Sequence, residues 1–217
     1  MKTKGFKLYS VAYFLACLLS LFFIDKNTSV IEMVIKIISL VFLSFLYLSV
    51  TKKINYWYLL VLMNSIASDA FLIFDNDFLI VGMLLLLANR FIYIILSRKA
   101  LVETKLKILL YYLLPGSFLF VIIFLLLKPY LSGVSNTFIL LGFSSALMIG
   151  FSFLNYLNNM TKDNKYFLLG ILLIVTADIL IAYNKFLDYR IFVVLLYTAM
   201  YYVARYLICL AMIKEKN

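Results

Sequence analysis

Four ionisable side chains lie within stretches of the sequence that are otherwise apolar enough to enter a lipid bilayer. Asp69 occurs in LLVLMNSIASDAFLIF and Arg90 in FLIVGMLLLLANRFIYIIL. The same two residue types recur near the carboxyl end as Asp178 and Arg205. A charged side chain at that depth is energetically costly, so it usually has a partner or a function. The sequence therefore predicts a site built from two buried acids and two buried bases.

Tyrosine side chains accompany both arginines. Tyr197, Tyr201 and Arg205 recur at intervals of four residues, which places them on one face of a helix. Tyr93 follows Arg90 by about one helical turn. Charge balance favours pairing of the two bases with the two acids, whereas a planar guanidinium group is also suited to bind a phosphate through two hydrogen bonds. A structural role and a ligand-binding role both remain open for the arginines.

The composition indicates that membrane helices must position these residues. Of the 217 residues, 66% are hydrophobic and 14% are charged, and the mean hydropathy is +1.07, which excludes an ordinary soluble domain. The net charge of +10 does not indicate nucleic-acid binding, because the Lys and Arg residues cluster in short loops between apolar runs. The sequence has no His, the usual acid-base group at neutral pH and the commonest metal ligand, so we expect no metal and no other cofactor.

Eight apolar runs follow one another, each near the roughly 20 residues that span a bilayer. We expect an all-α integral membrane protein, an eight-transmembrane-helix bundle that forms a single domain over residues 1–217. The expected helices cover residues 6–24, 29–50, 55–74, 77–97, 105–127, 134–157, 166–184 and 190–213. Gly142, Ala146 and Gly150 form a series of small residues that predicts close packing of the sixth helix.

The distribution of basic residues predicts the orientation of the bundle. Thirteen of the 20 Lys and Arg residues lie in the termini and in the loops on the same side, and four lie in the opposite loops. We therefore expect both termini to be cytoplasmic, in a multi-pass protein of the bacterial inner (plasma) membrane. The third and fourth expected helices resemble the seventh and eighth, because each pair carries an Asp followed by an Arg. This resemblance suggests a 4+4 parallel repeat.

In this orientation Asp69 and Asp178 lie at a similar depth, about 8 Å inside the outer ends of their helices at about 1.5 Å per residue. Two carboxyl groups at one level can share a cavity, where burial and mutual repulsion would hold one of them protonated as a general acid. Alternatively, each acid is locked in a structural ion pair. Lys36 lies near the same level, where it could pair with an Asp, bind an anionic headgroup or extend to the membrane interface.

Five stretches carry a resemblance to a known family. ADILIAYNKF at 177–186, which contains Asn184, matches the spacing Ser-Asp-x3-Ala-x-Asn-Arg/Lys-Phe, and it is followed by YYVARYLI, similar to Tyr-Tyr-x-Ala-Gln-x-Leu-Ile. The other stretches are SDAFLIF at 68–74, VIKIISLVFLSF around Lys36, and Gly82 to Tyr93, similar to Gly-x7-His-x2-Tyr. Together they resemble the YhhN-like family of lysoplasmalogenase-like integral membrane proteins over nearly the whole chain.

The resemblance implies a membrane-embedded hydrolase that cleaves the vinyl ether bond of a lysoglycerophospholipid to a fatty aldehyde and a glycerophospho-alcohol. Asp69 and Asp178 would be the catalytic pair, one donating a proton and the other stabilising a cationic intermediate. The residues expected to bind substrate are Lys36, Arg90, Tyr93, Asn184, Tyr201 and Arg205. The expected partners are the lysophospholipid substrate and membrane lipid, with no nucleic acid. The alternative is a non-catalytic member of the family that binds or transports a lipid or a metabolite.

Two departures from the family pattern change the charge of the expected site. Arg90 stands where the family usually has His, and Arg205 stands where it usually has Gln. Both changes add a positive charge to the expected cavity, and an Arg cannot release a proton as a His can. The expected cavity is therefore more cationic than the resemblance alone would imply.

Reporter fusions test the predicted orientation. A reporter that is active only in the cytoplasm should be active after Asn217 and inactive when inserted within residues 128–133, because most of the basic residues lie on the side of the termini. A reporter that is active only outside the cytoplasm should give the opposite pattern. A carboxyl terminus on the outer side would refute the orientation.

Overall fold

The computed structural model describes residues 4–24, 29–73, 75–97, 106–131 and 133–213. Within these residues the chain forms eight α-helices and a short 3-10 helix, with no β-strand. The elements are α1 (Lys4–Phe23), α2 (Ser29–Val50), α3 (Tyr56–Ile73), α4 (Asp75–Ser97), α5 (Leu106–Leu127), η2 (Lys128–Tyr130), α6 (Ser135–Asn158), α7 (Lys162–Phe186) and α8 (Ile191–Met212). The predicted all-α architecture with eight helices is confirmed.

Seven of the described helices are long and apolar enough to cross a membrane, which makes this a multi-pass integral membrane protein. The helix outside this group is α3, which has 18 residues and carries Asn64 and Asp69. A helix satisfies its backbone hydrogen bonds within the segment, so apolar runs in lipid become helical even where one contains Pro115, as α5 does. The basic loop at 98–105 and both chain ends, on which much of the predicted orientation depends, lie outside the described residues.

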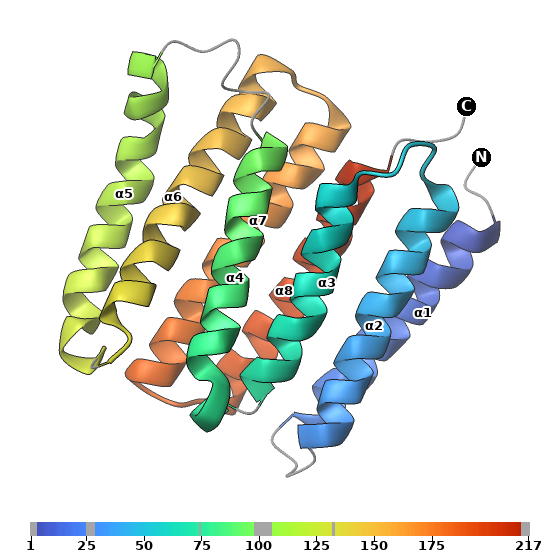
Figure 1. The fold of residues 1–217 in the computed structure, drawn as a ribbon, viewed down its shortest axis with the longest axis horizontal. Coiled ribbons are helices and arrows are strands. Elements are labelled where there is room, and N and C mark those ends of the chain that lie inside the picture. The colour runs from blue at the N-terminus through green and yellow to red at the C-terminus, as the bar shows by residue number, and fades with distance from the viewer. Residues whose placement is uncertain (1–3, 25–28, 74, 98–105, 132, 214–217) are drawn as a thin grey trace.

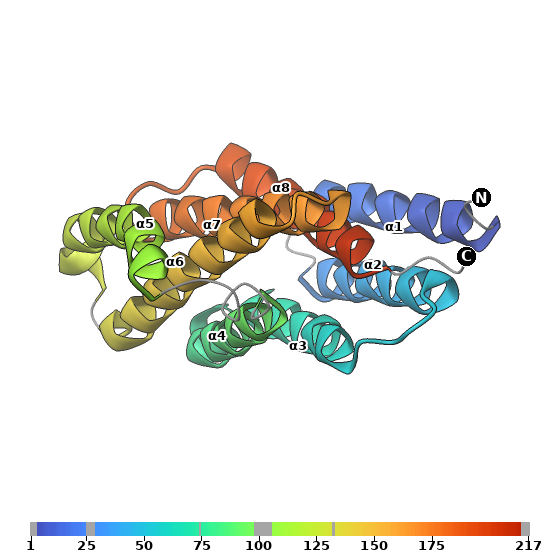
Figure 2. The same ribbon diagram turned by 90° about the horizontal axis from the view of Figure 1, so that it is seen from above.

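The helices lie side by side, and both chain termini are at one end of the bundle (Figure 1). Helices α1, α3, α5 and α7 all end at the opposite end, where the next helix in each case begins. Seen from above, α7, α8 and α1 lie along one side and α4, α3 and α2 along the other, and α6 packs against both α4 and α7 (Figure 2). Helix α5 lies at one edge of the bundle and packs mainly against α6.

The buried side chains of the core come mainly from α1, α2, α3, α7 and α8. The largest cluster includes Tyr13, Leu43, Tyr47, Val61, Ile171 and Ile208. Large apolar side chains also cover the outer surface of the bundle, and Phe118 and Phe192 are examples. In a bilayer these outer side chains contact hydrocarbon, so the high apolar content needs no further explanation.

Two close helix contacts depend on small residues. A β-carbon on Gly170 of α7 would lie 3.0 Å from the carbonyl oxygen of Ala204 in α8, so glycine allows the close approach of these two helices. In α6, the ring of Phe120 packs against Gly142, and the side chain of Leu113 packs against Gly150. Both of these side chains come from α5. The close packing predicted for the small-residue series of α6 is confirmed. These contacts bring α7 against α8 and α5 against α6 around a shared interior space.

Candidate functional site

A cavity of about 840 Å³ lies among the helices, and each of the eight α-helices contributes to its wall. This volume falls within the range of ordinary small-molecule sites, about 300 to 1,000 Å³. Phe23, Glu32 and Tyr189 mark its extent toward the end of the bundle opposite the termini, while Arg90 and Arg205 lie deeper along their helices. The two acids, the two buried arginines and Lys36 all line this one cavity. The structure thus brings together most of the residues that the sequence singled out.

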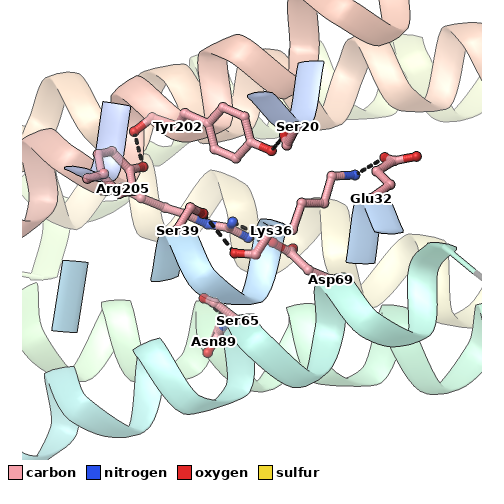
Figure 3. A network of polar contacts seen from close by, with 10 residues as sticks. Ser20, Glu32, Lys36, Ser39, Ser65, Asp69, Asn89, Tyr202 and Arg205 are labelled. Carbon is pink, nitrogen blue, oxygen red and sulfur yellow. Dashed lines mark hydrogen bonds and ion pairs between the residues drawn. The ribbon is translucent and has the colours of Figure 1, made fainter. Parts of the chain in front are cut away.

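Asp69 and Arg205 form the better-aligned of the two buried ion pairs. Nη1 of Arg205 donates to Oδ2 of Asp69 at 2.6 Å, and Nη2 donates to Oδ1 at 2.7 Å. Figure 3 shows Arg205 extending from α8 toward Asp69 on α3. The exposed fractions of the two side chains are only 8% and 15%. Because both carboxylate oxygens face one guanidinium fork, this pair is fixed in orientation as well as in charge.

Asp178 has two different partners. Nη2 of Arg90 on α4 donates to its Oδ2, and the phenol hydroxyl of Tyr201 on α8 donates to its Oδ1. The guanidinium of Arg205 also lies over the ring of Tyr201, 5.5 Å from its centroid, which adds a cation–π contact between the two pairs. A hydroxyl group can give one proton while accepting another, which a guanidinium cannot do. Asp178 is therefore the acid whose surroundings suit proton transfer.

The guanidinium of Arg90 is not saturated by Asp178. Its Nε and Nη1 are buried and have no hydrogen-bond partner among the described residues. Arg90 also borders a separate pocket of about 20 Å³, lined in addition by Ser65, Asn89 and Tyr93. Such a polar space is large enough for one water molecule, and Oδ1 of Asn89 is a further unsatisfied acceptor there. Arg90 thus keeps two donors for a small polar group.

Lys36 pairs with neither Asp. Its ammonium group lies 2.6 Å from Oε1 of Glu32, one turn earlier in α2, and both side chains line the cavity (Figure 3). A Lys36–Asp pair, one of the alternatives raised by the sequence, is therefore wrong. The sequence interpretation also missed Glu32 as a cavity residue, although its spacing of four from Lys36 is the usual signal for such a pair. Anionic headgroup binding by Lys36 stays a prediction.

Two other predicted substrate residues have structural contacts. Tyr93 borders the small pocket and not the large cavity, and its ring packs edge-on against Phe167 at 6.1 Å. This placement does not favour direct contact between Tyr93 and a ligand in the large cavity. Asn184 does line the cavity, and its Oδ1 accepts the backbone N–H of Arg190 at 2.7 Å. The amide of Asn184 therefore also holds the segment between α7 and α8.

Tyr202 is a cavity residue that the sequence interpretation did not select. Its hydroxyl shares a hydrogen bond with Ser20 of α1, and its carbonyl oxygen accepts the hydroxyl of Tyr13 at 2.8 Å. Tyr197 and Tyr201 were identified because they precede Arg205 at intervals of four residues. Tyr202 does not fit that interval, although Tyr202 also lies about one helical turn before Arg205. These contacts fix α1 against α8 beside the Arg205 pair.

The described part of the chain contains no cluster of three or more His, Cys, Asp or Glu side chains that could hold a metal ion. What the cavity offers instead is three carboxylates, phenol hydroxyls, guanidinium and ammonium groups, and apolar side chains. This combination can bind an amphiphile that carries an anionic group and can transfer protons to it.

Comparisons with known proteins agree with this picture at the family level. A sequence profile of the YhhN family matches residues 31–212 of the chain. No curated protein and no solved structure matches it. The matched range includes Lys36, both acids and both buried arginines, whereas α1 lies before it.

A double-mutant comparison tests whether Asp69 and Arg205 act as one unit. Asp69→Leu leaves a buried guanidinium without its carboxylate, and Arg205→Met leaves a buried carboxylate without its guanidinium. Each single change should therefore destabilise the protein by about 3–5 kcal/mol. The double variant should recover most of this loss, because an apolar pair replaces an ionic one. The effect is measured by the thermal unfolding midpoints in detergent, which should be highest for the wild type, lower for the double variant and lowest for the two single variants.

The exposed pair Asp188–Arg190 provides the matched control. Its charged groups are 2.7 Å apart, but the side chains are 46% and 66% exposed. Arg190→Met should therefore lower the thermal unfolding midpoint much less than either buried change does. If the losses from Asp69→Leu and Arg205→Met simply add in the double variant, the two residues are not energetically coupled.

Proposed function

The chain belongs to the YhhN family, and from this premise we propose that it is a membrane-embedded hydrolase of the lysoplasmalogenase type. Its substrate is a lysoglycerophospholipid whose single chain is attached through a vinyl ether bond. The observation that carries the proposal is the location of Asp69 and Asp178 on the wall of one cavity that also contains basic and apolar side chains. In that cavity the basic side chains can bind a phosphate, the carboxyl groups can act on an acid-labile bond, and the apolar side chains can pack against a hydrocarbon chain.

The reaction requires only water and proton transfer. A proton is added to the alkenyl carbon that does not carry the ether oxygen, and the other alkenyl carbon becomes an oxocarbenium-like cation. The oxygen of water bonds to that cation and loses a proton, which gives a hemiacetal. The hemiacetal hydroxyl then gives up its proton, the bond from the same carbon to the glycerol oxygen breaks, and the glycerol oxygen takes up a proton. The products are the fatty aldehyde and the glycerophospho-alcohol. Protonation is the difficult step, so a positioned acid and a nearby carboxylate are the groups that accelerate it.

The different partners of the two acids support different roles. Asp178 accepts a hydrogen bond from the hydroxyl of Tyr201, so we assign proton donation to Asp178 with Tyr201. Both oxygens of Asp69 are held by Arg205, so Asp69 is assigned to stabilise the cation as a carboxylate. Lys36, near the end of the cavity, is assigned to the phosphate.

The ion pairs also support the proposed repeat. The acid of α3 pairs with the base of α8, and the acid of α7 pairs with the base of α4. If α3 is exchanged with α7, and α4 with α8, the α3–α8 pair becomes the α7–α4 pair. A parallel repeat with a two-fold relation would require this correspondence. With both termini cytoplasmic, the end of the cavity near Glu32 would face the outer half of the membrane.

A non-catalytic protein that binds or transports an amphiphile is the second candidate. The observation in its favour is that both carboxylates already face guanidinium groups. A site whose charges are fully paired can select a ligand without transferring a proton to it. Turnover separates the two candidates, since only the hydrolase releases aldehyde.

Aldehyde release from a vinyl-ether lysophospholipid by the purified protein tests the proposal. Asp178→Asn and Asp69→Asn should each lower the rate by about 10² to 10⁴-fold, the usual contribution of a positioned acid or base. Tyr201→Phe should lower it by about tenfold, the value of one hydrogen bond to a charged group. The wild-type protein should release one aldehyde for each glycerophospho-alcohol.

Exposed residues of the same types serve as controls. Asp188→Asn and Tyr183→Phe should leave the rate unchanged, because neither side chain lines the cavity. Saturable binding of the lipid without aldehyde release would support the second candidate. Unchanged rates in Asp178→Asn and Asp69→Asn would show that another group supplies the proton.

The two arginines that depart from the family pattern provide a separate test. Arg90→His and Arg205→Gln together restore the residue types of the family pattern, in which the group at position 90 can release a proton. Hydrolysis at neutral pH should then rise by about tenfold, equivalent to about 1.4 kcal/mol of barrier. If the arginines instead select a more anionic lipid, binding of that lipid should weaken. A fall in thermal stability with both quantities unchanged would identify the arginines as counter-ions only.

A further inference from the structure

One wall of the cavity carries none of the ionisable groups discussed above. It is formed by α5 and α6, and we call it the chain wall. Its main residues are Gly116, Leu119, Phe120, Ile123, Leu141 and Gly142. Neither α6 nor the part of α5 from residue 108 to 127 contains an Asp, Glu, Lys or Arg. The charged lining residues come instead from α2, α3, α4, α7 and α8.

The chain wall offers very little to a polar ligand. Ser145 is its polar side chain, and the hydroxyl of Ser145 donates to the carbonyl oxygen of Leu141 at 2.8 Å within α6. A polar group placed against this wall would lose its hydrogen bonds to water without replacement, which is costly. A hydrocarbon chain loses nothing there and gains from burial. The chemistry of the wall therefore selects an alkyl chain.

The arrangement of the helices separates the two ends of a bound amphiphile. Helices α2 and α5 lie toward opposite ends of the long axis of the molecule in both views (Figures 1 and 2). The Glu32–Lys36 pair is on α2, and the chain wall is on α5 and α6. An amphiphile in this cavity thus lies across the bundle, with its polar part toward α2 and its chain toward α5.

Phe120 limits the space along the chain wall. A β-carbon on Gly142 would overlap the Phe120 ring, so the ring rests directly on the backbone of α6. The rings of Phe124 and Phe138 lie 6.1 and 6.2 Å from it, centroid to centroid. The Phe120 ring itself lines the cavity. A side chain at position 142 would have to displace this ring, so the residue at 142 affects the space that the ring leaves in the cavity.

We propose that the chain wall binds the single alkyl chain of the amphiphile and that Phe120, held in place by Gly142, sets the length of chain that fits. This inference rests on the proposed function for the identity of the amphiphile. It adds the location of the chain and the residues that determine chain-length specificity. Neither residue takes part in proton transfer.

The test uses saturated alkyl-ether lysophospholipids of increasing chain length, which have no vinyl ether bond to cleave. Their affinities for the protein in nanodiscs of one composition are referred to the free aqueous concentration of each lipid, which is measured separately, so that partition into the bilayer does not enter. Affinity should then rise by about fourfold for each added methylene until the chain reaches the ring, and then level off. Phe120→Ala should extend the rise to longer chains. Gly142→Ala should turn the ring into the cavity and end the rise at shorter chains.

Phe118→Ala is the matched control, because Phe118 is on the same helix but is 69% exposed and does not line the cavity. Its profile should coincide with that of the wild type. A Phe120→Ala profile that also coincides with the wild type would overturn the inference, even if Gly142→Ala fails to fold, because Phe120→Ala introduces no clash.

The same series separates this inference from the proposed reaction. If the profiles shift but no aldehyde forms from the vinyl-ether lipid, the chain wall stands and the hydrolase proposal fails. If aldehyde forms but its dependence on chain length is the same in wild type, Phe120→Ala and Gly142→Ala, the hydrolase stands and the chain wall is wrong.

Discussion

A guanidinium group inside a bilayer is stable only beside a carboxylate, and this requirement accounts for how the central helices are arranged. Asp69 on α3 meets Arg205 on α8. Asp178 on α7 meets Arg90 on α4. Each pair joins an early helix to a late one, so neither half of the chain can neutralise its own buried charges in this arrangement. The four helices must assemble together, and the cavity forms where they meet.

The two pairs are alike in charge but different in chemistry. Arg205 occupies both oxygens of Asp69 with its planar fork, which fixes a charge in place. Asp178 divides its oxygens between a guanidinium and the hydroxyl of Tyr201. Acid-base catalysis by two carboxyl groups depends on such a difference in surroundings, because one group must hold a proton while the other stays charged.

The cavity divides into a charged region and an apolar region because its helices differ in composition. Helices α5 and α6 supply small and apolar side chains, and α5 lies at the edge of the bundle, against lipid. A chain held there would remain in surroundings similar to a bilayer, whereas the proposed reacting groups lie among the charged helices. A single-chain amphiphile matches this division without any rearrangement of the fold.

The sequence alone determined the eight helices and the four ionisable residues within apolar runs, because hydrophobic runs and positions along a helix are local properties. It did not determine which Arg meets which Asp, that Lys36 pairs with Glu32, or that Tyr93 lies outside the large cavity. These depend on the order and rotation of helices around the bundle. The helical period indicates which residues share a face of one helix. Which residues of other helices contact that face depends on how the helices pack.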